Sequence, residues 1–138
     1  MKENFAFYGT LKNLDTLEGK FGIETIECMT GQVRGCLYEV QDSTEPTGTY
    51  VYPLLDTEGS GTVNAVLVVL DIDETERQKI INTISEYEGP LFKAIQVDFY
   101  TQSSDVISAY VFGWDKKAVL PSAIISKMKP NTDNKYTW

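Results

Sequence analysis

Short apolar runs, each followed by turn-forming residues, divide the first part of the chain into strands. The segment Phe5–Tyr8 is apolar and stops at Gly9, which is typical of a buried strand that ends in a turn. Residues 23–29 and 32–40 alternate loosely on either side of Thr30-Gly31. This arrangement predicts a β-hairpin with its turn at the Thr-Gly pair.

The next apolar segments also predict strands. Residues 51–55 are extended in character, but Pro53 lacks an amide hydrogen and therefore excludes a position in the centre of a sheet. Residues 62–70 are rich in valine and almost wholly apolar, which predicts a strand buried on both faces. Residues 93–101 and 106–112 predict two further strands joined by a polar Gln-Ser-Ser-Asp turn.

One segment has clear helical character. Asp73 and Glu76 fit a capping box, and acidic residues in the first turn suit the positive end of the helix dipole. The segment ends abruptly at Gly89-Pro90. Between these ends lies an apolar stripe at helical spacing, made by Ile80, Ile81, Ile84 and Tyr87.

The strands outnumber the helix, so the sequence predicts an α+β fold with a curved or closed sheet. We expect residues 1–113 to form one domain. Residues 114–138 form a basic and polar tail, with room for a short helix over 122–128, that packs on this domain or extends it.

Composition narrows the possible functions. The chain has 138 residues and a net charge of −8, which disfavours a nucleic-acid polymer as partner because the phosphates would be repelled. No apolar run is long enough to span a bilayer, and no secretory signal pattern is present, so we expect a soluble cytoplasmic protein, either a monomer or a homodimer.

Histidine is absent, so any catalysis depends on carboxylates, hydroxyls, lysines or backbone dipoles, and we predict no metal and no cofactor. Cys28 and Cys36 are interpreted as reduced core thiols, with pairing across the predicted hairpin as the alternative.

Two places could carry chemistry. After the first strand, Tyr8, Gly9, Thr10 and Leu11 could form a turn whose amides converge on an anion, or an ordinary strand-to-loop turn. Glu88, at the end of the helix, is a candidate general base, because partial burial and the helix dipole would both raise its pKa. The alternative is a solvated carboxylate at a helix end.

Together these segments resemble the gamma-glutamylcyclotransferase-like family, which includes the plant avirulence-induced proteins and the gamma-glutamylamine cyclotransferases. The resemblance runs in order from Phe5 to Phe112. Its motifs are Phe7-Tyr8-Gly9-Thr10-Leu11-Lys12, Gly35-Cys36-Leu37-Tyr38, Tyr52-Pro53-Leu54-Leu55, Ile84-Ser85-Glu86-Tyr87-Glu88-Gly89 and Ala109-Tyr110-Val111-Phe112.

This resemblance implies a small mixed β-barrel with flanking helices and an enclosed pocket. It implies that the amides of Tyr8, Gly9, Thr10 and Leu11 hold the α-carboxylate of a γ-glutamyl group. Glu88 would take a proton from the α-amine, which attacks the δ-carbonyl and releases 5-oxoproline. By the same resemblance, the pocket is expected to include Tyr38, Tyr52, Pro53 and Tyr110.

The sequence differs from the family at supporting positions. Ala65-Val66 stands where the family has Gly-Glu, Ser85 replaces an aspartate, and Phe92-Lys93-Ala94 replaces Tyr-x-Arg. Glu88 and the turn from Tyr8 to Leu11 are nevertheless present, and the leading hypothesis is a cyclotransferase. The alternative is a non-catalytic pocket protein, of a kind a phage could encode, that binds or sequesters a small anionic metabolite or nucleotide-like signal. A third hypothesis is an interaction module anchored by Trp114, Tyr136 and Trp138, for which packing of the tail is the simpler explanation.

Overall fold

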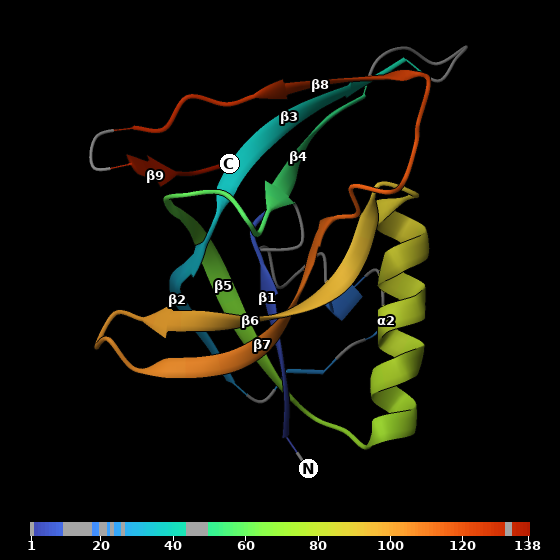
Figure 1. The fold of residues 1–138 in the computed structure, drawn as a ribbon. Helices are drawn as coiled ribbons and strands as arrows, with labels where there is room; N and C mark the ends of the chain where they lie inside the picture. Colours follow the sequence, from blue (N-terminus) through green and yellow to red (C-terminus); the bar gives the residue numbers. More distant parts are fainter. Residues whose placement is uncertain are drawn as a thin grey trace.

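A computed structural model of the chain describes residues 2–9, 18–19, 22, 24–25, 27–43, 50–131 and 134–138. Figure 1 shows the arrangement of its elements. In chain order these are β1 (Lys2–Phe7), β2 (Glu27–Arg34), β3 (Cys36–Asp42), β4 (Tyr50–Asp56), β5 (Thr62–Asp71), α2 (Glu74–Glu88), β6 (Phe92–Thr101), β7 (Val106–Trp114), β8 (Ala123–Lys127) and β9 (Lys135–Tyr136).

Five strands close into a barrel. Their order is β1-β7-β6-β2-β5, and β5 pairs with β1 to complete the ring. The β1–β7 pair is parallel, whereas the other pairs of the ring are antiparallel, so the barrel is mixed. Closure removes the free sheet edges that invite aggregation. The predicted α+β fold with a small mixed β-barrel is confirmed, and among the described elements helix α2 flanks the barrel.

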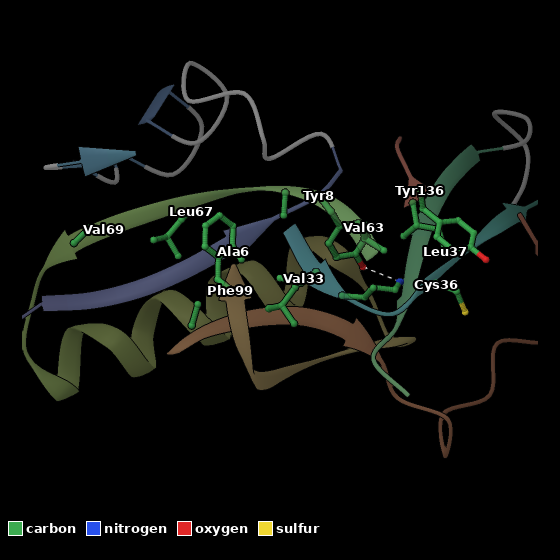
Figure 2. Close-up of a cluster of buried hydrophobic side chains, with 14 residues drawn as sticks. Ala6, Tyr8, Val33, Cys36, Leu37, Val63, Leu67, Val69, Phe99 and Tyr136 are labelled. Atoms are coloured by element: carbon green, nitrogen blue, oxygen red, sulfur yellow. Dashed lines mark hydrogen bonds between the residues drawn. The ribbon is translucent and has the colours of Figure 1, made fainter. Parts of the chain in front are cut away.

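The barrel interior is a packed apolar core. Alternate residues of each strand point inward, as Ala6, Val33, Leu67 and Phe99 do in Figure 2, and all four are buried. The predicted burial of β5 on both faces holds only for its second half. In its first half, buried Val63 and Ala65 alternate with more exposed neighbours.

Helix α2 covers one outer side of the barrel. Phe5 and Phe7 of β1 point outward and form a second apolar cluster with Ile84 of the helix. A salt bridge of 3.0 Å between Arg77 and Glu3 joins the helix to the same strand. The register of β1 therefore fixes both the inner core and the position of α2.

The ends of α2 follow the prediction. The side chain of Asp73 accepts a hydrogen bond of 2.8 Å from the backbone N–H of Glu76, and the helix stops at Gly89, whose φ is 100°. Tyr87, however, is 40% exposed. The predicted apolar stripe therefore packs on the barrel through its three isoleucines, and Tyr87 lies at a more exposed position of the helix.

A three-stranded sheet in the order β4-β3-β8 lies beside the barrel. Pro53 lies in β4 at the edge of this sheet, which confirms that it is not in a central strand. The short helix expected over residues 122–128 is wrong. This segment forms β8, because β3 offers it a ladder of partners from Tyr38 to Asp42.

The predicted hairpin at Thr30-Gly31 is also wrong. Both residues lie inside β2, and Gly31 is a glycine because a Cβ there would lie 2.3 Å from the carbonyl oxygen of Tyr100. The chain turns instead at Gly35, whose φ is 143°, and then enters the other sheet. Both cysteines are free, but Cys28 is exposed and only Cys36 is a core thiol.

Candidate functional site

A small cavity of about 50 Å³ lies where the end of β1, β4, the end of α2 and β7 meet. The last residue of the chain adds a further wall. The lining residues within the described part of the chain are Ala6, Phe7, Tyr8, Gly9, Val51, Tyr52, Pro53, Glu88, Phe112 and Trp138.

Glu88 is the acidic residue of this cavity. It is the last residue of α2, and the turn that follows is fixed because the N–H of Gly89 donates to the carbonyl of Ser85 at 3.0 Å. Burial raises the pKa of Glu88 to about 7. Among the described residues, no hydrogen bond or salt bridge engages its carboxylate. A carboxylate with this pKa can accept and return a proton near neutral pH.

The Tyr8 hydroxyl has a structural role beside it. It donates a hydrogen bond of 2.7 Å to the carbonyl of Phe112. It also accepts one of 3.0 Å from the N–H of Leu55, which is the dashed line in Figure 2. Burial raises the pKa of Tyr8 far above its usual value, and the nearby charge of Glu88 adds to the shift. The hydroxyl therefore stays protonated, and its one proton is already used within the protein.

Strand β4 forms another part of the cavity wall. A Cβ at Gly9 would approach Cγ of Pro53 to 3.2 Å, so the turn after β1 packs closely on this proline. The ring of Tyr52 lies 5.8 Å from that of Phe92. Burial, followed by the charges of Asp42 and Glu88, raises the pKa of Tyr52 to about 12. Tyr52 is thus a neutral hydroxyl in the wall of the cavity that Glu88 also lines.

The structure brings together some of the predicted site residues. Tyr8, Gly9, Tyr52, Pro53 and Glu88 all line the cavity. Thr10 and Leu11, the rest of the predicted anion-binding turn, lie outside the described residues.

Two predicted pocket residues lie elsewhere. The ring of Tyr38 packs 5.0 Å from that of Trp114, and Tyr110 packs 5.7 Å from Phe5 with the Arg77 guanidinium over its ring. Neither lines the cavity, because both belong to the packing between the barrel and its outer elements.

The tail contributes a wall that the sequence reasoning did not place. Tyr136 in β9 pairs with Val63 of β5 and is buried in the barrel core, and Trp138 then reaches the cavity. The aromatic residues considered as partner anchors are therefore used inside the molecule. Only the aromatic character of the tail could have indicated this, since nothing in the sequence marks the β5–β9 pairing.

The described residues contain no group of three acidic or cysteine side chains close enough to hold a metal ion. None of the described helices is long and apolar enough to cross a membrane.

Comparison with known proteins shows the fold. No protein-family model and no curated protein matches the sequence. Among solved structures, a gamma-glutamyl cyclotransferase is 9% identical with a TM-score of 0.60, over 83% of this chain and 67% of that one. A protein of Arabidopsis thaliana is 15% identical with a TM-score of 0.54, over 88% of this chain and 74% of that one.

The same architecture occurs inside a larger enzyme. Allophanate hydrolase of Kluyveromyces lactis is 10% identical with a TM-score of 0.53, over 93% of this chain but only 19% of that one. The chain therefore has the gamma-glutamylcyclotransferase-like fold that its motifs predict. At these identities the likeness shows the fold alone.

Proposed function

We propose that the protein is a cyclotransferase that releases 5-oxoproline from a γ-glutamyl amine or a related small molecule, with Glu88 as its general base. One observation carries this proposal. Glu88 has a pKa raised to about 7 and lines a cavity together with Tyr8 and Gly9, which directly follow β1, in a gamma-glutamylcyclotransferase-like fold.

The proposed reaction needs one base. The carboxylate of Glu88 takes a proton from the α-ammonium group of the substrate, and the free amine attacks the δ-carbonyl carbon. The new C–N bond closes the five-membered ring, and the bond from that carbon to the leaving nitrogen breaks. The leaving nitrogen receives the proton from Glu88, and the second proton of the attacking nitrogen also ends on the amine product. No oxidant, reductant or water is consumed.

Tethering of the two reacting groups makes such a simple site sufficient. The amine and the carbonyl belong to one molecule, so binding in a folded conformation supplies much of the barrier reduction. In the proposal, backbone amides of Gly9, Thr10 and Leu11 hold the α-carboxylate. Tyr52 is neutral at physiological pH and supplies a hydroxyl beside the base.

The size of the cavity bears on substrate entry. A volume of about 50 Å³ admits only a few water molecules, at roughly 10–15 Å³ of such volume for each one. A γ-glutamyl group is larger, so a wall must move on binding. Trp138 is the wall we infer to move, because β9, the strand that holds this end of the tail, is only two residues long.

A second candidate is a non-catalytic protein that binds a small anionic metabolite or nucleotide-like signal in the same cavity. It is favoured by Val66, Ser85 and Ala94, which stand where the resembled family has polar side chains. Such a protein would bind its ligand without changing it, and binding would survive Glu88→Gln.

The test is turnover of a panel of γ-glutamyl amines and γ-glutamyl amino acids, with 5-oxoproline detected by mass spectrometry. Glu86→Gln is the matched control for Glu88→Gln, since Glu86 is exposed and lies on the same last turn of α2. The proposal expects product from the wild type and from Glu86→Gln, and at least about a hundredfold less from Glu88→Gln. Binding without product in all three would favour the second candidate.

A further inference from the structure

A second and much larger concavity lies on the outside of the barrel. It has a volume of about 870 Å³, within the range of about 300–1,000 Å³ that is usual for small-molecule sites. We call it the β2–β5–β6 groove. Its described lining residues are Thr30, Gly31, Gln32, Arg34, Thr62, Asn64, Ala65, Val66, Tyr100, Thr101, Gln102 and Ser104. None of these lines the Glu88 cavity.

The floor of the groove is a row of paired strand residues. Gln32 is the direct partner of Asn64 on one side and of Tyr100 on the other, so the three side chains stand on one face of three neighbouring strands. Figure 1 shows these strands, β2, β5 and β6, within the barrel. A hydrogen-bonded sheet is a rigid support, and the positions of these groups are therefore set before any ligand arrives.

Internal hydrogen bonds orient the amide groups. Gln32 Nε2 donates to Asn64 Oδ1 at 3.3 Å, Asn64 Nδ2 donates to Thr137 Oγ1 at 2.6 Å, and Gln102 Nε2 donates to Thr30 Oγ1 at 2.9 Å. Each amide has two N–H donors and a carbonyl with two lone pairs, so these bonds leave donors and acceptors over. Together with the threonine and serine hydroxyls, they match hydroxyl or amide groups of an organic molecule.

The charge of the groove differs from that of the protein. The chain carries 20 acidic and 12 basic residues, yet the described lining has no carboxylate and one arginine. The guanidinium carbon of Arg34 lies 5.4 Å above the ring centroid of Tyr100. This is a cation–π contact, and the edges of the guanidinium, which carry its N–H groups, form no salt bridge with a described residue. Those edges bind carboxylate or phosphate with two parallel hydrogen bonds.

We propose that the β2–β5–β6 groove is a second ligand site, which takes a small organic anion carrying hydroxyl or amide groups, with its carboxylate or phosphate on Arg34. The hydrogen-bonding groups of the ligand contact Gln32, Asn64 and Gln102. The proposal is independent of the chemistry assigned to Glu88, because the two cavities share no lining residue.

The test uses the intact protein labelled with ¹⁵N and followed by NMR. Gluconate and glucose 6-phosphate serve as the carboxylate and phosphate probes, and glucose serves as the uncharged control. We expect saturable shifts of the side-chain amides of Gln32, Asn64 and Gln102 with one or both anions, and much weaker binding of glucose. The arm with the tighter binding identifies which anionic group the site prefers.

Variants make the assignment specific. Arg34→Gln is expected to weaken binding of the anion about tenfold or more. Arg34→Lys is expected to weaken it less, because the positive charge stays while the two parallel N–H donors of the guanidinium are lost. Lys93→Gln is the control, since it removes the same charge from an exposed side chain outside the groove. Three results would overturn the proposal: no saturable shift with either anion, equal affinity in Arg34→Gln and the wild type, or shifts confined to Gly9 and Trp138.

Discussion

The hydroxyl of Tyr8 accepts a hydrogen bond of 3.0 Å from the backbone N–H of Leu55, and so joins the end of β1 to β4. The same hydroxyl donates to the carbonyl of Phe112 in β7. Three strands that are distant in the sequence are thus held around one buried oxygen. This junction forms part of the wall of the Glu88 cavity.

The first prediction concerns this junction. Tyr8→Phe leaves a buried N–H and a buried carbonyl without their partner, so we expect it to lower the free energy of unfolding by about 1–3 kcal/mol. Urea denaturation measures the change. Tyr100→Phe is the matched control, because this partly exposed tyrosine has a ring contact with Arg34 but no hydrogen bond from its hydroxyl to a described residue, and the substitution should change stability by less than about 0.5 kcal/mol. Equal effects of the two substitutions would show that the Tyr8 hydroxyl does not support the fold.

The second prediction concerns the cost of keeping Glu88 in the cavity. The pKa of Glu88 is about 7 in the folded protein, whereas the ordinary value of 4.5 applies to the unfolded chain. Between pH 4.5 and 7 the folded state therefore binds more protons than the unfolded state. Stability should therefore fall as pH rises from about 4.5 to 7. Glu88→Gln removes this dependence.

We expect Glu88→Gln to be about as stable as the wild type at pH 4.5 and more stable at pH 8, by on the order of 3 kcal/mol. Chemical denaturation at both pH values measures the difference. Glu86→Gln should leave the pH dependence as it is. A Glu88→Gln variant with the same pH dependence as the wild type would mean that the Glu88 pKa is not raised by the fold.

A third prediction uses the tail as a reporter. The sequence has two tryptophans, so Trp114→Phe leaves Trp138 as the single indole. Because Trp138 and Glu88 line one small cavity, ionisation of the carboxyl should change the indole emission. We expect a fluorescence titration with a midpoint near pH 7. The transition should be absent when Glu88→Gln is added to Trp114→Phe, and its persistence would place another group beside the indole.

A fourth prediction concerns Gly31. A Cβ at this position would lie 2.3 Å from the carbonyl oxygen of Tyr100 and 2.6 Å from Cζ of Phe99, so Gly31→Ala must push β2 and β6 apart. We expect a loss of about 1–3 kcal/mol in unfolding free energy. Gly19→Ala, where nothing lies within 4 Å of the new Cβ, is the control. A harmless Gly31→Ala would contradict the strand pairing described for β2.

The sequence predicted those elements whose signals are local. The helix could be located because Asp73 caps its start and Gly89 ends it, and Pro53 assigned β4 to an edge. The hairpin turn predicted at Gly31 was wrong, because glycine occurs both in turns and at positions where a neighbouring strand fills the space of a side chain. Its neighbour in space, Tyr100, is far along the chain and could not be identified from a local pattern.

The tail shows the same limit. Residues 123–127 contain two adjacent isoleucines, and a short apolar run of this kind does not distinguish a helix from a strand until its partner is known. The partner is β3, and the pairing is non-local. Trp138 reaches the candidate site through an equally non-local pairing, so the site could be predicted around Glu88 and Tyr8 but not on this side.

The measurement that tests the proposed chemistry most directly is turnover of the γ-glutamyl panel in water enriched in ¹⁸O. Attack by the α-amine predicts unlabelled 5-oxoproline and free amine in equal amounts from the wild type, with both products lost in Glu88→Gln. Labelled glutamate would show that water is the nucleophile, and absence of any product across the panel would contradict the cyclotransferase assignment.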